Sequence, residues 1–202
     1  RNKLHSTINI LGLSLGIAVV ILIFLFVQNE LSQDKWHKEE GNIYRLFRHW
    51  GDKTAGWVWS PPPMVDLVEA EVPEVMNATG LLESENRLVD FNGKKIYAPK
   101  SALVDSTYFL TIPQPFLYGN HENALETPSS LVISENFAKK LFGDKDPVGE
   151  MVKVDGSYDY QISGVVDDAT KTHLKYDLYM TMPWQQNDWL NNQNATYIRL
   201  SE

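Results

Sequence analysis

Four side chains that could bind a metal ion or transfer a proton lie close together in the sequence. They are Asp167, Asp168, His173 and Asp177. Carboxylates and imidazole are common metal ligands, and they also serve as general acids and bases in hydrolysis. Charged residues that follow a strand are equally typical of a solvated turn. The sequence leaves both interpretations open: a tethered hydrolase that uses Asp167, Asp168 or His173, and a turn without chemistry.

Two further stretches match only part of a known catalytic or ion-binding pattern. Ser32 and Lys35 have the S-x-x-K spacing of serine acyl-enzymes, but the S-D-N and K-T-G motifs that complete such sites do not occur. Residues 144–155 resemble a calcium-binding loop, but Val148 stands where that loop needs an oxygen ligand. The sequence has no Walker A loop, G-x-S-x-G or H-E-x-x-H motif. We therefore predict no enzyme activity, cofactor or metal in this segment.

Two tryptophans are candidate contacts for a partner molecule. Trp57 and Trp59 are separated by one residue, so an extended backbone would place both indoles on one face. Such a pair could receive a peptide, sugar or lipid, or it could pack inside the domain. The spacing does not choose between these two roles.

An apolar segment near the start of the chain would anchor the part that contains these residues. Ile8–Gln28 has no charged residue, and 15 of its 21 residues are Leu, Ile, Val or Phe. A helix of this length spans about 30 Å, the thickness of the bilayer core. The apolar core of a cleaved signal peptide is shorter, about 7 to 15 residues. We therefore predict an uncleaved transmembrane helix, with membrane lipid as a partner.

Two glycines could let this helix pack closely against another. Gly12 and Gly16 are four residues apart, which places them on one face in the small-xxx-small pattern of membrane helix pairs. Glycine is also frequent in membrane helices that make no such contact. The pattern therefore names Gly12 and Gly16 as helix-packing candidates.

Charge and cysteine content exclude several classes of partner and site. Residues 29–202 contain 16 basic and 26 acidic residues, so the part beyond the helix is acidic. Nucleic-acid binding needs clustered Lys and Arg, and no such cluster occurs. The chain has no cysteine, so its fold depends on an apolar core rather than on disulfides or thiolate-bound metal.

The rest of the chain reads as a mixed α+β domain. Periodicity predicts short helices at 64–72 and 135–142, with Ser134 capping the second and Gly143 ending it with a positive φ. Asn92-Gly93 and Asp155-Gly156 predict hairpin turns. Residues 108–119, which contain two prolines, are expected to form a loop held by its large side chains. The predicted strands are 43–50, 57–59, 75–82, 87–91, 94–104, 129–133, 151–154, 158–166, 176–182 and 195–200.

Several of these stretches together resemble the amino-terminal part of permease subunits of MacB/FtsX-like ABC transporters. The similarity lies in ordered motifs that cover nearly all of the chain. They are INILGLSLG at 8–16, ELSQDKWH at 30–37, IYR at 43–45, SENFAKKLFG at 134–143, DPVG at 146–149 and ISGVVD at 162–167. The ordered combination is far more specific than any one of these motifs.

The resemblance implies a fold, a place in the cell and a set of partners. Residues 1–34 would be a cytoplasmic stub and transmembrane helix, and residues 35–202 an extracytoplasmic MacB-like core domain of two lobes, incomplete at its C-terminus. The chain would cross the inner membrane once, with this domain in the periplasm. A cytoplasmic ABC ATPase, a second permease unit and a periplasmic or outer-membrane protein would be its partners, and nucleic acid would not.

The implied role is mechanical. Such a domain would couple the motion of a separate ATPase to export, lipoprotein extraction or activation of a partner in the envelope. The alternative is a single-pass anchored sensor or ligand-binding adaptor, with Trp57 and Trp59 as its contacts. The number of further hydrophobic spans encoded downstream would distinguish these two functions.

Overall fold

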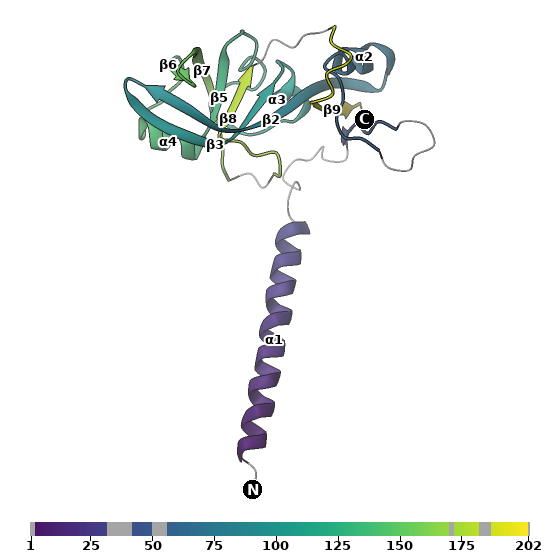
Figure 1. Cartoon of the computed structure of the whole chain (residues 1–202), viewed down its shortest axis with the longest axis vertical. Coiled ribbons are helices and arrows are strands. Elements are labelled where there is room, and N and C mark those ends of the chain that lie inside the picture. The colour runs from purple at the N-terminus through teal and green to yellow at the C-terminus, as the bar shows by residue number, and fades with distance from the viewer. Residues whose placement is uncertain (1–2, 32–41, 50–55, 170–171, 182–186, 202) are drawn as a thin grey trace.

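The computed structural model describes residues 3–31, 42–49, 56–169, 172–181 and 187–201 (Figure 1). It begins with a helix, α1 (Lys3–Leu31). Its segment His5–Gln28 is long and apolar enough to cross a membrane, and none of it is buried against the rest of the described chain. This agrees with the predicted transmembrane helix at Ile8–Gln28.

The remaining elements form a sheet-rich domain. They are β1 (Ile43–Arg45), α2 (Met64–Glu71), β2 (Val75–Phe91), β3 (Lys94–Val104), α3 (Tyr108–Thr111), β4 (Phe116–Gly119), β5 (Ser130–Ser134), α4 (Glu135–Phe142), β6 (Met151–Val154), β7 (Tyr158–Val166), β8 (Leu178–Thr181) and β9 (Ala195–Leu200). The described strands form one mixed sheet in the order β1-β9-β2-β3-β8-β5-β7-β4, and β6 pairs with both β2 and β7. The predicted α+β class is confirmed, and one continuous sheet joins the parts that we expected as two lobes.

A long hairpin runs the length of this domain. Strand β2 continues through positions 83–86, where the sequence predicted a break, because the backbones of residues 83–85 pair with β3 and the same register resumes at Arg87. At the tip, Asn92 and Gly93 have φ values of 51° and 86°, as their type I′ turn requires. The Nζ atom of Lys94 donates to the carbonyl oxygens of Lys140 and Leu141 at 2.6 and 2.9 Å. The hairpin tip is therefore fixed to the last turn of α4.

Strand pairing also closes part of the sheet into a ring. The hairpin β2–β3 continues through β8, β5, β7 and β6, and β6 returns to β2 through the pairs Val89–Val154 and Asp90–Lys153. The backbone N–H of Asp155 donates to the Leu88 carbonyl oxygen at 2.8 Å, which extends this last contact. Six strands thus form a small barrel, which we call the strand ring, in the left half of Figure 1.

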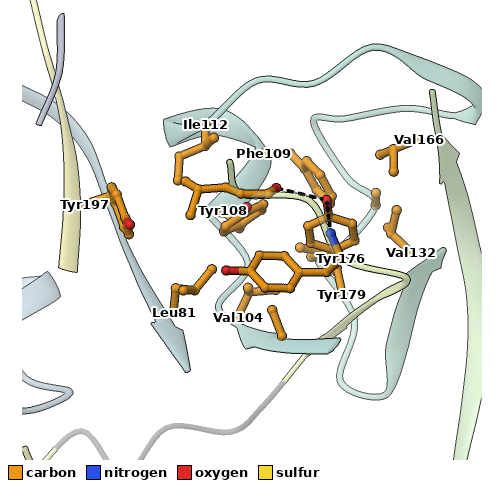
Figure 2. Packing of buried hydrophobic residues seen from close by; sticks show 14 of the residues in the cluster. Leu81, Val104, Tyr108, Phe109, Ile112, Val132, Val166, Tyr176, Tyr179 and Tyr197 are labelled. Atoms are coloured by element: carbon orange, nitrogen blue, oxygen red, sulfur yellow. Dashed lines mark hydrogen bonds between the residues drawn. The ribbon is translucent and has the colours of Figure 1, made fainter. Parts of the chain in front are cut away.

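Two cores lie on opposite faces of the central strands. In β8, Leu178 and Met180 face the interior of the strand ring, whereas Tyr179 between them faces the other core. The second core is aromatic: the ring centroid of Tyr179 lies 5.4 Å from Tyr108 and 5.2 Å from Phe109 (Figure 2). Helix α4 covers the first core and α3 contributes to the second. Strands buried on both faces need this double cover.

The segment 108–119 is more ordered than the predicted loop. It contains the helical turn α3 and the edge strand β4, separated by Pro113 and Pro115. Phe109 and Phe116 stack edge to face with centroids 4.9 Å apart, which ties the two short elements together. The loop assignment was wrong because the prolines mark a boundary between two elements, although the expectation of fixation by large side chains was right.

A half-buried carboxylate fastens α3 to the hairpin. Asp105 accepts hydrogen bonds from Thr79 Oγ1 and the Gly80 N–H, both at 2.7 Å, and from the Thr107 N–H at 3.1 Å. Burial raises the pKa of Asp105, and the hydrogen bonds from Gly80, Thr107 and Thr79 oppose that shift without cancelling it. The folded state therefore holds this proton more tightly than the unfolded chain. The contribution of Asp105 to the free energy of unfolding is full below the pKa that this carboxyl has in the unfolded chain. It is lost as the pH rises through the higher pKa of the folded state.

We predict that Asp105→Asn lowers the free energy of unfolding by about 1 to 3 kcal/mol, because an amide cannot accept from all of these donors. The difference in free energy of unfolding between the wild type and this variant should shrink as the pH rises from 4 to 7. Urea unfolding at several pH values measures both effects. Asp66→Asn, an exposed substitution, is the control and should change stability by less than about 0.5 kcal/mol. Equal losses for both variants would contradict this role of Asp105.

The turn after α4 contains the glycine that the sequence singled out. Ser134 Oγ accepts from the Phe137 N–H at 3.2 Å and caps the helix as predicted. Gly143 has φ 70° and ψ −134°. The positive φ is confirmed, but the ψ value lies outside the left-handed helical region, in one that essentially only glycine reaches. A Cβ added to Gly143 would meet no atom within 4 Å, so the backbone alone demands glycine.

We predict that Gly143→Val destabilises the domain by about 1 kcal/mol or more, through backbone strain and not through a clash. Urea unfolding monitored by tryptophan fluorescence measures this loss. Lys140→Ala, an exposed change in the same helix, is the control and should stay within about 0.5 kcal/mol of the wild type. A fully stable Gly143→Val protein would show that the turn can adopt another conformation.

Candidate partner-contact surface

The two candidate tryptophans lie at one edge of the sheet, in the segment that follows β1. Trp57 forms an isolated bridge with Arg48, and its side chain is 58% exposed. Trp59 is 38% exposed. The next residue, Ser60, is tied to the end of the sheet by two backbone hydrogen bonds with Asn194. The tryptophans are therefore held by a fixed backbone and reach the surface.

An arginine that the sequence analysis missed supports Trp59. The guanidinium of Arg45 lies 5.9 Å from the centroid of Trp59 and 5.7 Å from that of Tyr197, within the range of cation–π contacts. The Nη1 atom of Arg48 donates to Asn192 Oδ1 at 2.7 Å. The IYR motif contains Arg45, but nothing in the sequence indicated which aromatic rings it would meet. We call Trp57, Trp59 and the two arginines the Trp–Arg surface.

Asp168, one of the acidic candidates from the sequence, has a structural role. Asp168 Oδ2 accepts from the Asn136 N–H at 2.6 Å, at the positive end of α4. The other oxygen, Oδ1, lies 3.2 Å from Lys175 Nζ, and the side chain is only 9% exposed. Asp168 therefore caps α4 together with Ser134. Because 32 residues separate Asp168 from Asn136, no local pattern could have revealed this contact.

The other residues of that group are also engaged or dispersed. Asp167 Oδ1 accepts from the Ala169 N–H at 2.7 Å, within its own turn. Asp177 Oδ2 accepts from the Lys100 N–H at 3.0 Å, next to the pairing of β3 with β8. Across the described ranges, no three His, Asp or Glu residues, His173 included, lie close enough together to hold a metal ion. The contacts of Asp167, Asp168 and Asp177 are therefore those of a turn, a helix cap and a strand end.

The remaining sequence candidates have simple locations. Ser32 and Lys35 lie outside the described residues. In the calcium-like stretch, Asp146 accepts from the Val148 N–H at 3.0 Å, and Asp155 pairs with Arg87 at 2.7 Å. The first contact lies within a turn, and the second joins the turn after β6 to β2.

The buried tyrosines are structural as well. Desolvation raises the pKa of Tyr108 and Tyr179 well above the usual value, so both stay protonated near neutral pH. The hydroxyl of Tyr179 donates to Gln114 Oε1 at 3.1 Å. In α1, a Cβ added to Gly12 or Gly16 would meet no atom within 4 Å, so both glycines lie on an open helix face.

Comparison with known proteins identifies the family. The sequence profile of the MacB-like periplasmic core domain matches residues 6–202. The chain belongs to this family. The match includes both the apolar helix and the sheet-rich domain, and it confirms the resemblance to MacB/FtsX-like permeases. A search of curated protein sequences gave no match.

Solved structures show that this MacB-like chain shares its fold with transporter domains. A domain of a Porphyromonas gingivalis protein described as a permease gives a TM-score of 0.67 at 20% sequence identity. The match covers 79% of this chain and 75% of the Porphyromonas chain. The periplasmic region of MacB from Actinobacillus actinomycetemcomitans gives a TM-score of 0.54 at 15% identity, and the match covers 80% of this chain and 74% of the MacB chain. The extracellular domain of the noncanonic ABC-type transporter YknZ from Gram-positive bacteria gives a TM-score of 0.57 at 16% identity, and the match covers 80% of this chain and 84% of the YknZ chain. These identities are low, so the structures support the fold alone.

We predict that Trp57→Ala changes the free energy of unfolding by less than about 0.5 kcal/mol, because the side chain is mostly exposed. Phe109→Ala, an aromatic truncation in the buried core, is the contrasting variant and should cost about 3 to 5 kcal/mol. Urea unfolding of both variants decides whether Trp57 is a surface contact or a packing residue. A loss above about 2 kcal/mol for Trp57→Ala would assign it to packing.

Proposed function

We propose that this chain is the N-terminal part of an ABC transporter permease subunit. Residues 1–34 would be the cytoplasmic stub and inner-membrane helix, and residues 35–202 the periplasmic domain. The observation that carries this proposal is the family match from residue 6 to residue 202, since it covers the helix and the domain as one unit. Members of the MacB-like family work with cytoplasmic ABC ATPases, and we infer such a partner here.

The domain would act by moving as a body. ATP-driven closure of the partner ATPase would shift the membrane helices, and the domain would transmit that motion to a molecule in the envelope. Strands buried on both faces and the ion pair between Arg87 and Asp155 favour a stiff unit. The work done would be export, lipoprotein extraction or activation of a periplasmic or outer-membrane partner, with a dimer of permease units as the moving assembly.

The Trp–Arg surface is the proposed contact for that envelope partner. Its exposed indoles carry large apolar area on a fixed backbone, which is typical of residues that dominate protein interfaces. The same exposure supports the second candidate function, a single-pass sensor or adaptor that binds a ligand through Trp57 and Trp59. A sensor would need no ATPase, and this difference separates the two functions.

Distance measurements on the complete transporter test the proposal. Residues 1–202 contain no cysteine, so Lys145→Cys, with any cysteine elsewhere in the permease and the ATPase replaced by serine, places one spin label on an exposed turn of each copy. The full-length permease is purified with its cytoplasmic ATPase in lipid nanodiscs, and the distance between labels is measured with and without ATP. We expect an ATP-dependent change that a hydrolysis-deficient ATPase traps in one state. An unchanged distance, or failure of the ATPase to co-purify, would favour the sensor.

We predict that Gly12→Leu and Gly16→Leu each reduce the assembled permease–ATPase complex about fivefold to tenfold, because a bulky side chain blocks close helix approach. Size-exclusion chromatography of the co-expressed proteins measures the assembled fraction. Ser14→Leu is the matched control, since it makes a similar increase in size about 200° around the helix from Gly12. An equal loss for Ser14→Leu would show that the glycine face is not the packing face.

A further inference from the structure

The arginines of the Trp–Arg surface have no acidic partner in the described part of the chain. Neither Arg45 nor Arg48 forms an ion pair there, and Asp188, in the adjoining segment, accepts instead from the backbone N–H groups of Leu190 and Asn191. Several basic side chains elsewhere in the domain are paired with Asp or Glu, namely Arg87, Lys95, Lys139, Lys153 and Lys175. The Trp–Arg surface therefore carries positive charge that the domain does not neutralise.

The excess of positive charge extends over the neighbouring segments of this sheet edge. Residues 42–49 and 56–60 contain two arginines and no acidic residue, and β9 adds Arg199, also without an acidic residue. Residues 29–202 as a whole contain 26 acidic and 16 basic residues. An acidic molecule is therefore repelled by most of the domain and attracted to this edge.

The guanidinium of Arg45 is held in place by aromatic rings. It lies 5.9 Å from the ring centroid of Trp59 and 5.7 Å from that of Tyr197. Its Nε atom is enclosed, whereas the terminal Nη1 and Nη2 atoms are neither enclosed nor bonded to a described residue. A guanidinium that is already ordered loses little side-chain entropy on binding, and its terminal nitrogens form a fork that matches a carboxylate.

The second arginine lies across from an exposed indole. Arg48 forms a backbone bridge with Trp57, whose side chain is 58% exposed. The hydrogen bond from Arg48 to Asn192 positions the guanidinium, but a neutral amide leaves its charge uncompensated. Trp and Arg are among the residues that most often dominate protein interfaces, and a positive surface selects partners of negative charge.

The composition of this edge fits an acidic protein segment better than an anionic membrane surface. Charge-driven lipid binding typically uses clusters of about four to eight Lys and Arg. Residues 42–49 and 56–60 contain no lysine, and their two arginines are fixed by rings and by an amide. Two ordered guanidinium groups on a sheet edge match a few defined carboxylates rather than a diffuse layer of headgroups.

We propose that the Trp–Arg surface binds an acidic segment of the envelope partner. Carboxylates of that segment accept from Arg45 and Arg48, and its apolar side chains lie on Trp57. This inference rests on the proposed role of the surface as a partner contact. It does not depend on coupling to an ATPase, which the distance measurements on the complete transporter test separately.

Peptide binding to the full-length permease, without its ATPase, tests the charge preference. The permease is held in nanodiscs of neutral phosphatidylcholine, and the probe is a fluorescein-labelled peptide in which Asp and Leu alternate. Fluorescence anisotropy measures the dissociation constant. We expect saturable binding that weakens as the salt concentration rises, and an affinity about tenfold lower for the peptide with Asn in place of Asp. Equal affinity for the two peptides, or no saturable binding of the Asp peptide, overturns the proposal.

Single substitutions locate the binding site of the Asp peptide. Arg48→Gln should raise its dissociation constant about tenfold, as expected for the loss of a charged hydrogen bond. Trp57→Ala, which should leave the fold intact, should raise it by a similar factor. Lys153→Gln is the matched control, since it removes the same charge from the exposed pair with Asp159 and should leave the constant unchanged. Equal weakening by Lys153→Gln, or none by Arg48→Gln and Trp57→Ala, would contradict this site.

Quenching by brominated lipid distinguishes a protein partner from the membrane surface. The permease is placed in nanodiscs that contain brominated phosphatidylglycerol, and tryptophan fluorescence is compared between the wild type and Trp57→Ala. We expect both proteins to lose the same fluorescence intensity to the quencher, because Trp57 faces water until a partner binds. A loss that Trp57→Ala abolishes would assign the surface to lipid and overturn the proposal.

Discussion

The structure depends on the burial of its central strands on both faces. Strand β8 presents Leu178 and Met180 to one core and Tyr179 to the other, and β5 alternates in the same way. A sheet with this pattern is stable only when both faces are covered. Helix α4 supplies one cover, while α3 and the rings of Tyr108 and Phe109 contribute to the other. The caps and turns of the domain serve to hold these covers in place.

Local sequence patterns predicted most helices, strands and turns, whereas contacts between distant residues could not be predicted from the sequence. The transmembrane helix, both Asn-Gly and Asp-Gly hairpins and the Ser134 cap follow from residue types within a few positions of one another. The return of β6 to β2 and the capping of α4 by Asp168 join residues that are tens of positions apart. Pro113 and Pro115 predict a loop from local pattern alone, and the sequence does not show that Phe109 and Phe116 stack.

The candidate sites illustrate the same division. The spacing of Trp57 and Trp59 left a partner contact and packing inside the domain equally open, and in the structure both side chains lie at the surface. The contacts of Arg45 could not be predicted, since they need several distant segments. The acidic group at 167–177 showed chemically suitable residues, but hydrogen bonds to the backbone define what Asp168 and Asp177 do. Residue type alone was therefore a poor guide to function there.

The position of β9 has a consequence for how the domain is made. In the sheet order, β9 lies between β1 and β2, although these two strands come more than a hundred residues earlier in the chain. Until residues 195–200 emerge, β1 lacks the strand with which it pairs, and one edge of β2 is open. Pairings of such high sequence separation form slowly. Completion of this end of the sheet must therefore follow synthesis of residues 195–200, so the sheet cannot close while the chain is still being made up to that point.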